Sequence, residues 1–212
     1  MKPADPARPS SRRSRQYRSG DERRLEIVQA TIAIIAEQGL REVKTAELAR
    51  RIGVSEATIF RHFASIEEIL VAAVTHEAGL LRARLERFEG SGTAWERAEQ
   101  LVLSLLEFFE DTGGGPIVIV TGQVIRISPA VRKVALKTLG VARARLLALG
   151  GEAAKTGPHG LAADQIADLL IAVVQSCALR WIMSERQWPM QANARAMLRV
   201  IGQAIAPEGG RA

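Results

Sequence analysis

The stretch of residues 45–63 constrains the fold of this chain more than any other part of its sequence. It has the pattern of two short amphipathic helices joined at Gly53. Two such helices need an apolar seam where they pack and a tight connection between them. Gly53 can adopt the positive φ of that connection, and Ser55 can cap the second helix. The pattern therefore predicts a helix-turn-helix. Its seam consists of apolar side chains from both helices: Leu48, Ala49, Ile52, Ile59 and Phe63.

The second helix of this motif leaves one face outside the seam, and that face can enter the major groove of DNA and touch base edges. Helix N-termini favour phosphate, which makes Thr45 and Ser55 candidates for contacts to the DNA backbone. His62 is either a phosphate contact or a half-buried helix residue. Glu56 either accepts a hydrogen bond from cytosine or complements the helix dipole. The residues predicted to bind DNA from this helix are Glu56, Ala57, Thr58, Phe60, Arg61 and His62.

Positive charge is concentrated in the N-terminal part of the chain. Residues 1–62 contain 13 Lys and Arg against 8 Asp and Glu, whereas the remaining residues contain 16 against 15. Residues 1–20 are rich in Pro, Ser and Arg and lack periodicity, which predicts a disordered basic arm. Such an arm suits a phosphate backbone, and Arg12, Arg13 and Arg15 are its predicted DNA contacts. A tail that only increases solubility would have the same composition.

The rest of the chain has helical periodicity. Capping boxes at Ser19, Ser65 and Thr93, and Ser128 before Pro129, predict the starts of four helices. These helices are expected to end near positions 38, 88, 111 and 150, and two more should contain residues 166–181 and 194–205. The fold class predicted is therefore all-α. The apolar stripe expected on the first helix is Leu25, Val28, Ile32 and Ile35.

Residues 22–72 resemble the tetracycline-repressor (TetR) family of bacterial regulators, because an introductory helix, the motif above and a trailing helix occur in the family's order and spacing. The resemblance implies a homodimer with a recognition helix at residues 56–62. It also implies phosphate contacts from Thr45 and His62, and a divergent C-terminal domain that binds a ligand and forms the dimer. The family usually has a lysine at position 66 that meets a phosphate. Ile66 stands there in this chain, so one expected backbone contact is missing.

On these patterns the chain divides into four parts. The predicted parts are a disordered arm (1–20), a helix-turn-helix DNA-binding domain (21–65), a helical ligand-binding and dimerisation domain (66–206) and a C-terminal tail (207–212).

Two features of the C-terminal domain are candidates for ligand binding. The apolar stretch 116–128 carries Gln123 and Arg126, and a buried Arg needs a partner. Arg126 therefore either binds an anionic or polar ligand, or pairs with a glutamate or reaches solvent. Trp181 is either a core or interface residue or the wall of a ligand pocket.

The last two helices resemble the family's dimerisation pair, because their apolar stripes are longer than one small domain needs. Two such helices from each subunit would form a four-helix interface. The residues predicted at this interface are Ile166, Leu170, Val173, Cys177, Ala194, Leu198 and Ile201.

Several classes of protein have no support in the sequence. No catalytic, phosphate-loop or metal-ligand pattern occurs, and one cysteine with three dispersed histidines predicts no metal and no cofactor. No uninterrupted apolar run is long enough to cross a membrane, and no secretory signal is found, so a cytoplasmic location is expected.

The function expected is that of a ligand-responsive repressor. It would bind a palindromic operator in double-stranded DNA as a homodimer, and a small-molecule inducer would release it. One alternative is a structural DNA-bound protein that recruits a protein partner, as the family's nucleoid-occlusion member does, which has similar Gly-Val-Ser-Glu-Ala and Arg-His-Phe segments. Another is an enzyme that uses this fold.

Overall fold

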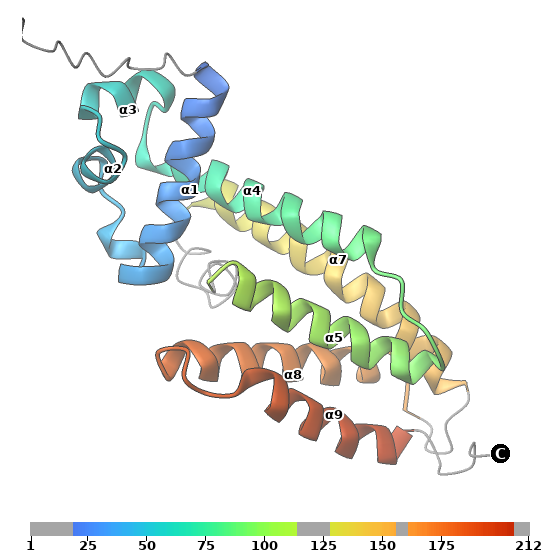
Figure 1. The fold of residues 1–212 in the computed structure, drawn as a ribbon. Helices are drawn as coiled ribbons and strands as arrows, with labels where there is room; N and C mark the ends of the chain where they lie inside the picture. The colour runs from blue at the N-terminus through green and yellow to red at the C-terminus, as the bar shows by residue number, and fades with distance from the viewer. Residues whose placement is uncertain (1–18, 114–127, 156–160, 206–212) are drawn as a thin grey trace, which may run out of the picture.

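The computed structural model describes residues 19–113, 128–155 and 161–205 of the chain (Figure 1). Within these ranges the chain forms eight α-helices, one short 3-10 helix and no β-strand, which confirms the all-α class. The elements are α1 (Gly20–Gln38), η1 (Leu40–Glu42), α2 (Thr45–Ile52), α3 (Glu56–His62), α4 (Ile66–Arg87), α5 (Ala94–Asp111), α7 (Pro129–Ala154), α8 (Ala163–Met183) and α9 (Met190–Ile205).

The N-terminal unit, formed by α1 to α3 and the start of α4, surrounds a small core of its own. Ile27 and Ile34 of α1, Leu48 of α2 and Ile59 of α3 are completely buried there, and Phe63 closes the core after α3. The first turns of α7 also pack against this core. The unit therefore joins the rest of the molecule through both α4 and α7.

Helix α1 begins as the sequence predicts and buries most of the predicted stripe, with Val28 and Ile35 in the core. The Ser19 hydroxyl accepts a hydrogen bond from the Glu22 N–H, and the Glu22 carboxylate accepts one from the Ser19 N–H, which completes the capping box. The expected apolar stripe is wrong at Leu25, whose side chain is 43% exposed, whereas Ile27 and Ile34 are fully buried. The reason is tertiary, since α1 packs on α2, α3 and α4.

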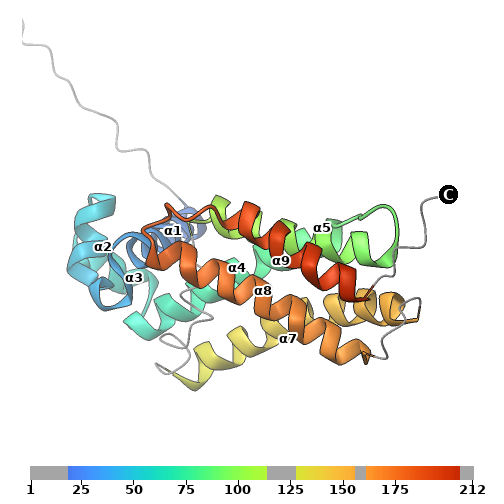
Figure 2. The ribbon, with the colours of Figure 1, turned by 90° about the horizontal axis from the view of Figure 1, so that it is seen from below.

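The C-terminal unit is a bundle of α4, α5, α7, α8 and α9. Both views place α8 beside α9 and α4 beside α7 (Figures 1 and 2). Helix α5 contacts α7, α8 and α9, and its buried side chains lie at the centre of the larger core. The predicted caps hold at two further helices. Thr93 forms a full capping box with Glu96, and Ser128 accepts a hydrogen bond from the Val131 N–H.

Helix α7 runs past the end that the sequence predicts. It was expected to end near position 150, but it continues through Gly150 and Gly151 to Ala154. A Cβ on Gly150 would lie 3.2 Å from both the Ala163 carbonyl oxygen and the Ile166 Cγ2 atom of the next helix. Glycine at this position therefore permits close packing of α7 against the start of α8, and it does not terminate the helix.

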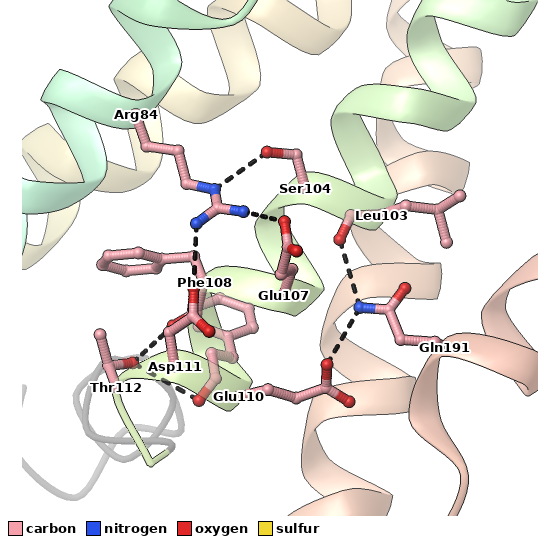
Figure 3. A network of polar contacts seen from close by, with 10 residues as sticks. Arg84, Leu103, Ser104, Glu107, Phe108, Glu110, Asp111, Thr112 and Gln191 are labelled. Atoms are coloured by element: carbon pink, nitrogen blue, oxygen red, sulfur yellow. Dashed lines mark hydrogen bonds and ion pairs between the residues drawn. The ribbon is translucent and has the colours of Figure 1, made fainter.

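Polar contacts fix α5 against its neighbours (Figure 3). The Arg84 guanidinium of α4 donates to the Ser104 hydroxyl at 2.9 Å and also pairs with Glu107 and with Asp111, the last at 3.2 Å. One arginine thus joins α4 to three positions on one face of α5. On the other side, the Gln191 amide of α9 donates to the Glu110 carboxylate at 3.2 Å.

The corner between α8 and α9 reaches back to the N-terminal unit. Glu185 and Arg186 have positive φ values of 53° and 68°, which turn the chain sharply after α8. The Arg186 guanidinium donates to the Ala36 carbonyl near the end of α1 at 2.9 Å and to the Gly113 carbonyl after α5 at 2.8 Å. One side chain therefore ties three distant parts of the sequence together.

Helix α8 is, by length and composition, the one helix among the described residues that could cross a membrane. Its fully buried side chains, such as Ile166, Leu170 and Cys177, pack in the larger core with α5, α7 and α9. This is the environment of a core helix in a bundle.

Candidate DNA-binding surface and ligand cavity

The helix-turn-helix has the geometry that its sequence predicts. Gly53 ends α2 in the left-handed conformation, with φ 72° and ψ 40°. Ser55 caps α3, because its hydroxyl accepts from the Thr58 N–H at 3.3 Å and lies 3.0 Å from the Thr58 hydroxyl. With Ile59 buried, Phe60 is left 52% exposed on the opposite side of the helix.

The exposed residues of α3 form its outer surface. They are Glu56, Ala57, Phe60 and Arg61. Thr58 and His62 are half-buried beside them. The apolar side chains of Ala57 and Phe60 and the guanidinium of Arg61 can contact thymine methyls and guanine edges in a major groove.

A hydrogen bond joins the first turns of α2 and α3, because the Thr45 hydroxyl donates to the Glu56 carboxylate. Thr45 is the residue predicted to meet a phosphate. Its hydroxyl faces a carboxylate oxygen in the absence of DNA, so a phosphate oxygen arriving there would have to displace a group of like charge.

Arg24 of α1 holds the end of the recognition helix. Its guanidinium donates to the His62 carbonyl oxygen and to the Glu68 carboxylate at 3.2 Å, and it lies 4.0 Å from the centre of the Phe63 ring. Glu68 in turn accepts from the Ala64 N–H at 2.8 Å. Half of the capping box predicted at Ser65 is therefore wrong. The Glu68 carboxylate accepts from the N–H of Ala64, one residue before the cap, and it also binds Arg24.

The His62 side chain lies in a positive environment. Partial burial, followed by the charges of Arg61, Arg23 and Arg24, lowers its pKa below the ordinary value. An imidazole that resists protonation in the free protein would gain a proton more readily beside a phosphate. Ile66, which stands where the family usually has lysine, packs against the core of the N-terminal unit.

Several predicted site residues lie outside the described ranges. These residues are Arg12, Arg13 and Arg15 of the basic arm, and Gln123 and Arg126 of the apolar stretch. Trp181 is described, and it is buried in the larger core rather than in the lining of the cavity below. The structure therefore places Trp181 in the core, one of the two positions expected for it, and outside the lining of this cavity.

A cavity of about 750 Å³ lies between α4, α5, α7 and α8. Most of its wall is apolar, with Leu81, Leu105, Phe109, Leu146 and Ile171 among the lining side chains. Its volume is in the range of pockets that bind small molecules. Two lining residues, Val74 of α4 and Ala135 of α7, also belong to the core of the N-terminal unit.

Glu77 is a deeply buried charged residue in this mostly apolar wall. Its side chain is 5% exposed, and its Oε2 atom has no hydrogen-bond partner within the described parts of the chain. Burial raises its pKa to about 7. Burying a carboxylate without a partner costs free energy of folding, and an ionisable group in a cavity whose pKa is strongly perturbed is a candidate for function.

A charged pair stands where the cavity meets solvent. The Arg143 guanidinium of α7 donates to Asp168 Oδ1 of α8 through Nε at 3.2 Å and through Nη2 at 3.1 Å. Both residues line the cavity, and both side chains are partly exposed. Because these two charges satisfy each other, Glu77 is the charged group without a partner among the described residues that line the cavity.

Sequence reasoning missed this cavity, although α4 carries a signal for it. Leu70, Val74, Leu81 and Leu85 lie on the buried side of α4, and Glu77 interrupts them. A carboxylate on the apolar side of a helix is a reason to search for a functional site. The walls from α7 and α8 give no comparable signal.

The residues predicted at a dimer interface lie inside a single chain. Ile166, Leu170, Cys177, Ala194 and Leu198 are at most 1% exposed, and Val173 is also buried. They pack in the larger core between α5, α7, α8 and α9, so their side chains are not available to a second copy. Only Ile201 is half-buried. The apolar stripes form the bundle interior, so an interface on α8 and α9 would have to use other side chains of these helices.

The described residues contain no group of His, Cys, Asp or Glu side chains that could hold a metal ion.

Comparison with known proteins identifies the class to which this architecture belongs. The model of the N-terminal domain of bacterial regulatory proteins of the tetR family matches residues 27–73, which include α2, α3 and the start of α4. Residues 27–73 are therefore a DNA-binding domain of the tetR family, which makes the chain a DNA-binding transcriptional regulator.

Two relatives with curated functions show how far the similarity extends. The fatty acid metabolism regulator protein of Bacillus subtilis (strain 168) is 23% identical over 188 residues, which cover 85% of this chain and 94% of that protein. The nucleoid occlusion factor SlmA of Shewanella amazonensis is 26% identical over 174 residues, covering 77% and 84%.

Solved structures share the whole fold. The regulator FadR from Bacillus subtilis, in complex with stearoyl-CoA, superimposes with a TM-score of 0.69 at 17% identity over 85% of this chain and 98% of that one. A regulator from Saccharomonospora viridis, in complex with choline, gives a TM-score of 0.73 at 20% identity over 86% and 96%.

Proposed function

We propose that the protein is a ligand-responsive repressor, in which a small molecule in the cavity changes the affinity of the recognition helix for its operator. One observation supports this most directly. Val74 and Ala135 line the cavity and are also part of the core of the N-terminal unit, so a ligand would touch the packing that orients α2 and α3. A ligand shifts such an equilibrium only by its differential affinity for the two states.

Helix α4 supplies a mechanical connection for this response. Its Glu77 lines the cavity, while Glu68, nine residues earlier on the same helix, binds Arg24 beside the end of the recognition helix. The two carboxylates are about 14 Å apart along the helix axis at 1.5 Å per residue. A small rotation of α4 about its far end would therefore move the support of α3.

The ligand-bound relatives are consistent with this role. Stearoyl-CoA and choline were found in the two structurally similar regulators. We propose that this chain likewise takes a small organic ligand, and that its role is regulatory and not catalytic. Such a regulator would work in the cytoplasm.

The repressor would act as a homodimer on a palindromic operator. Exposed apolar side chains on α8 and α9, namely Met183 and Val200 at 75% and 67% exposure together with Leu169, offer a surface for a second copy. Two recognition helices would then meet half-sites about 34 Å apart, or another groove-matched distance. In such a dimer the basic arm, residues 1–20, would add non-specific affinity for phosphates.

The ligand response can be tested before the ligand is known. An operator is first selected from genomic fragments, and its affinity is then measured by fluorescence anisotropy. Ala78→Trp fills the cavity from α4, whereas Ala144→Trp adds the same ring to an exposed position on α7. Coupling between sites is typically about 5- to 150-fold, so Ala78→Trp should change operator affinity by at least fivefold.

Equal operator affinity for Ala78→Trp, Ala144→Trp and the unaltered protein would contradict a coupled cavity. Thermal unfolding of each variant establishes that the fold is retained.

A second function has one observation in its favour, the similarity to nucleoid occlusion factors. The factor from Aliivibrio fischeri is 32% identical over 105 residues, which cover 49% of this chain and 53% of that protein. Occupancy along the genome distinguishes the two. A repressor would occupy a few promoters, and a structural DNA-bound protein would occupy many dispersed sites.

A further inference from the structure

The chemistry of the cavity restricts the ligand that it can hold. The wall is formed largely by aliphatic side chains and Phe109, so the body of a ligand must be apolar. The polar side chains in the lining are Glu77, Thr138, Gln175 and the pair Arg143 and Asp168. The Thr138 hydroxyl is already used, because it donates to the Val134 carbonyl at 2.9 Å.

Charge balance singles out Glu77 among these groups. Arg143 and Asp168 bind each other at the edge, and within the described residues no cation pairs with the Glu77 carboxylate. An ionised carboxylate in a dry site needs a cation or hydrogen-bond donors to offset its lost hydration. A ligand that carries a positive nitrogen into the cavity would supply the cation, and a protonated amine would supply hydrogen-bond donors as well.

We propose that the cavity binds an amphipathic cation, an apolar molecule with a basic or quaternary nitrogen, and that Glu77 recognises the nitrogen. This inference rests on the proposed ligand-responsive function and specifies its ligand class. A hydrogen bond from a charged N–H to a carboxylate is roughly twice as strong as a neutral hydrogen bond. Phe109, also in the wall, offers an aromatic ring, and aromatic faces attract organic cations.

An anionic ligand such as a fatty acid fits this site less well. Its carboxylate would approach Glu77 in a low-dielectric site, where like charges repel strongly. Arg143 could neutralise it only by leaving Asp168, to which two of its nitrogens already donate. A neutral alcohol would avoid the repulsion but would leave the carboxylate charge unbalanced.

Three probes of equal chain length test this order: decylammonium, decanol and decanoate, each measured below its aggregation concentration. Binding to the full-length protein is measured by calorimetry, and release of the selected operator is measured by anisotropy. The cation should bind at least tenfold more tightly than the alcohol, which is the scale of a hydrogen bond to a charged group. Decanoate should bind most weakly.

Variants of α4 connect the preference to one side chain. Glu77→Gln should bring the cation and the alcohol within about threefold of each other while leaving the affinity for the alcohol unchanged. Glu77→Asp, which retains the carboxylate, should restore the preference for the cation. Glu86→Gln on the exposed side of α4 is the matched control and should behave like the unaltered protein. Because the alcohol reports on each variant, a misfolded variant is recognised by its failure to bind either probe.

Other outcomes separate this inference from the proposed function. Tightest binding of decanoate, an undiminished cation preference in Glu77→Gln, or no binding of the cation at millimolar concentration would overturn the ligand class. Operator release by decanoate or decanol would still support a ligand-responsive repressor. Conversely, tight binding of the cation through Glu77 with no effect on the operator would support the ligand class and contradict the proposed repressor mechanism.

Discussion

Replacing Glu77 by Gln should make the protein more stable at alkaline pH and should change how its stability depends on pH. Burial raises the pKa of this carboxyl from 4.5 to about 7 in the folded protein, so the folded state holds the proton more tightly than the unfolded state. The contribution of Glu77 to stability is therefore most favourable below pH 4.5, falls as the pH rises towards 7, and levels off above it. This dependence of stability on pH is opposite in sign to that of a carboxylate paired with an arginine, whose contribution to stability is lost as the pH falls.

The magnitude follows from the size of the shift. A change from 4.5 to about 7 is 2.5 units. At 1.36 kcal/mol per unit it corresponds to about 3 kcal/mol at pH 8, and to less than about 1 kcal/mol at pH 5. Total stabilities of domains are about 5–15 kcal/mol, so the effect is easily measured.

The assay is urea denaturation at a fixed chain concentration between pH 5 and pH 8. The free energy of unfolding of Glu77→Gln minus that of the unaltered protein should rise by roughly 2–3 kcal/mol over this range. Carboxylates whose pKa is lowered, such as Glu37 beside Arg51 and Glu68 beside Ala64 and Arg24, contribute equally to both proteins and cancel. Glu86→Gln should give no such rise. A difference that stays constant with pH would refute the reasoning, because it would mean that Glu77 is hydrated or paired in solution.

Other substitutions test separate parts of the structure. Gly202→Ala should destabilise the protein by about 1–3 kcal/mol in thermal unfolding, because the new Cβ would lie 2.4 Å from Trp95 Nε1. Gly79→Ala, whose Cβ would lie in open space on α4, should stabilise the protein by about 0.5–1 kcal/mol. The pKa of His62 is lowered in the free protein and should be higher in the DNA complex, so operator affinity should rise as the pH falls through the interval between these two values. His62→Gln should flatten this dependence of affinity on pH in anisotropy titrations at constant salt. Arg61→Ala should relax the preference at particular base pairs, by about 1–3 kcal/mol for a lost bidentate contact, and a uniform loss on all single-base variants of the operator would make Arg61 a phosphate anchor. Val200→Glu should shift the mass in sedimentation equilibrium from twice 23.0 kDa towards 23.0 kDa, and an unchanged dimer would exclude this face of α9 as the interface.

The start of most helices could be predicted from the sequence because a cap is a local interaction. Ser19, Thr93 and Ser128 each bond to a backbone N–H three residues further on, and no distant contact competes with them. At Ser65 a distant partner does compete, since Arg24 of α1 binds the carboxylate that would complete the box. The helix-turn-helix could be predicted for a similar reason, because its seam and turn lie within nineteen consecutive residues, 45–63.

Features that depend on the arrangement of helices could not be predicted in this way. Leu170 and Leu198 have the periodicity of an interface and of a core alike, and only the packing of α5 on both of their helices decides for the core. Gly150 looks like a helix terminator until the approach of α8 is known. The cavity is formed by four helices that are up to about a hundred residues apart in sequence, so no segment of the chain contains its pattern.

The contacts of Arg186 have a consequence for the reuse of this protein's parts. The two acceptors of Arg186, at Ala36 and Gly113, are main-chain carbonyls. The hydrogen bond to α1 therefore depends on where that helix ends and not on which side chain the helix carries there. A DNA-reading unit transplanted from another regulator, with an introductory helix of equal length, would present a carbonyl at the same place. Hybrid regulators with an exchanged N-terminal unit should therefore keep this hydrogen bond without any matching substitution in the C-terminal unit.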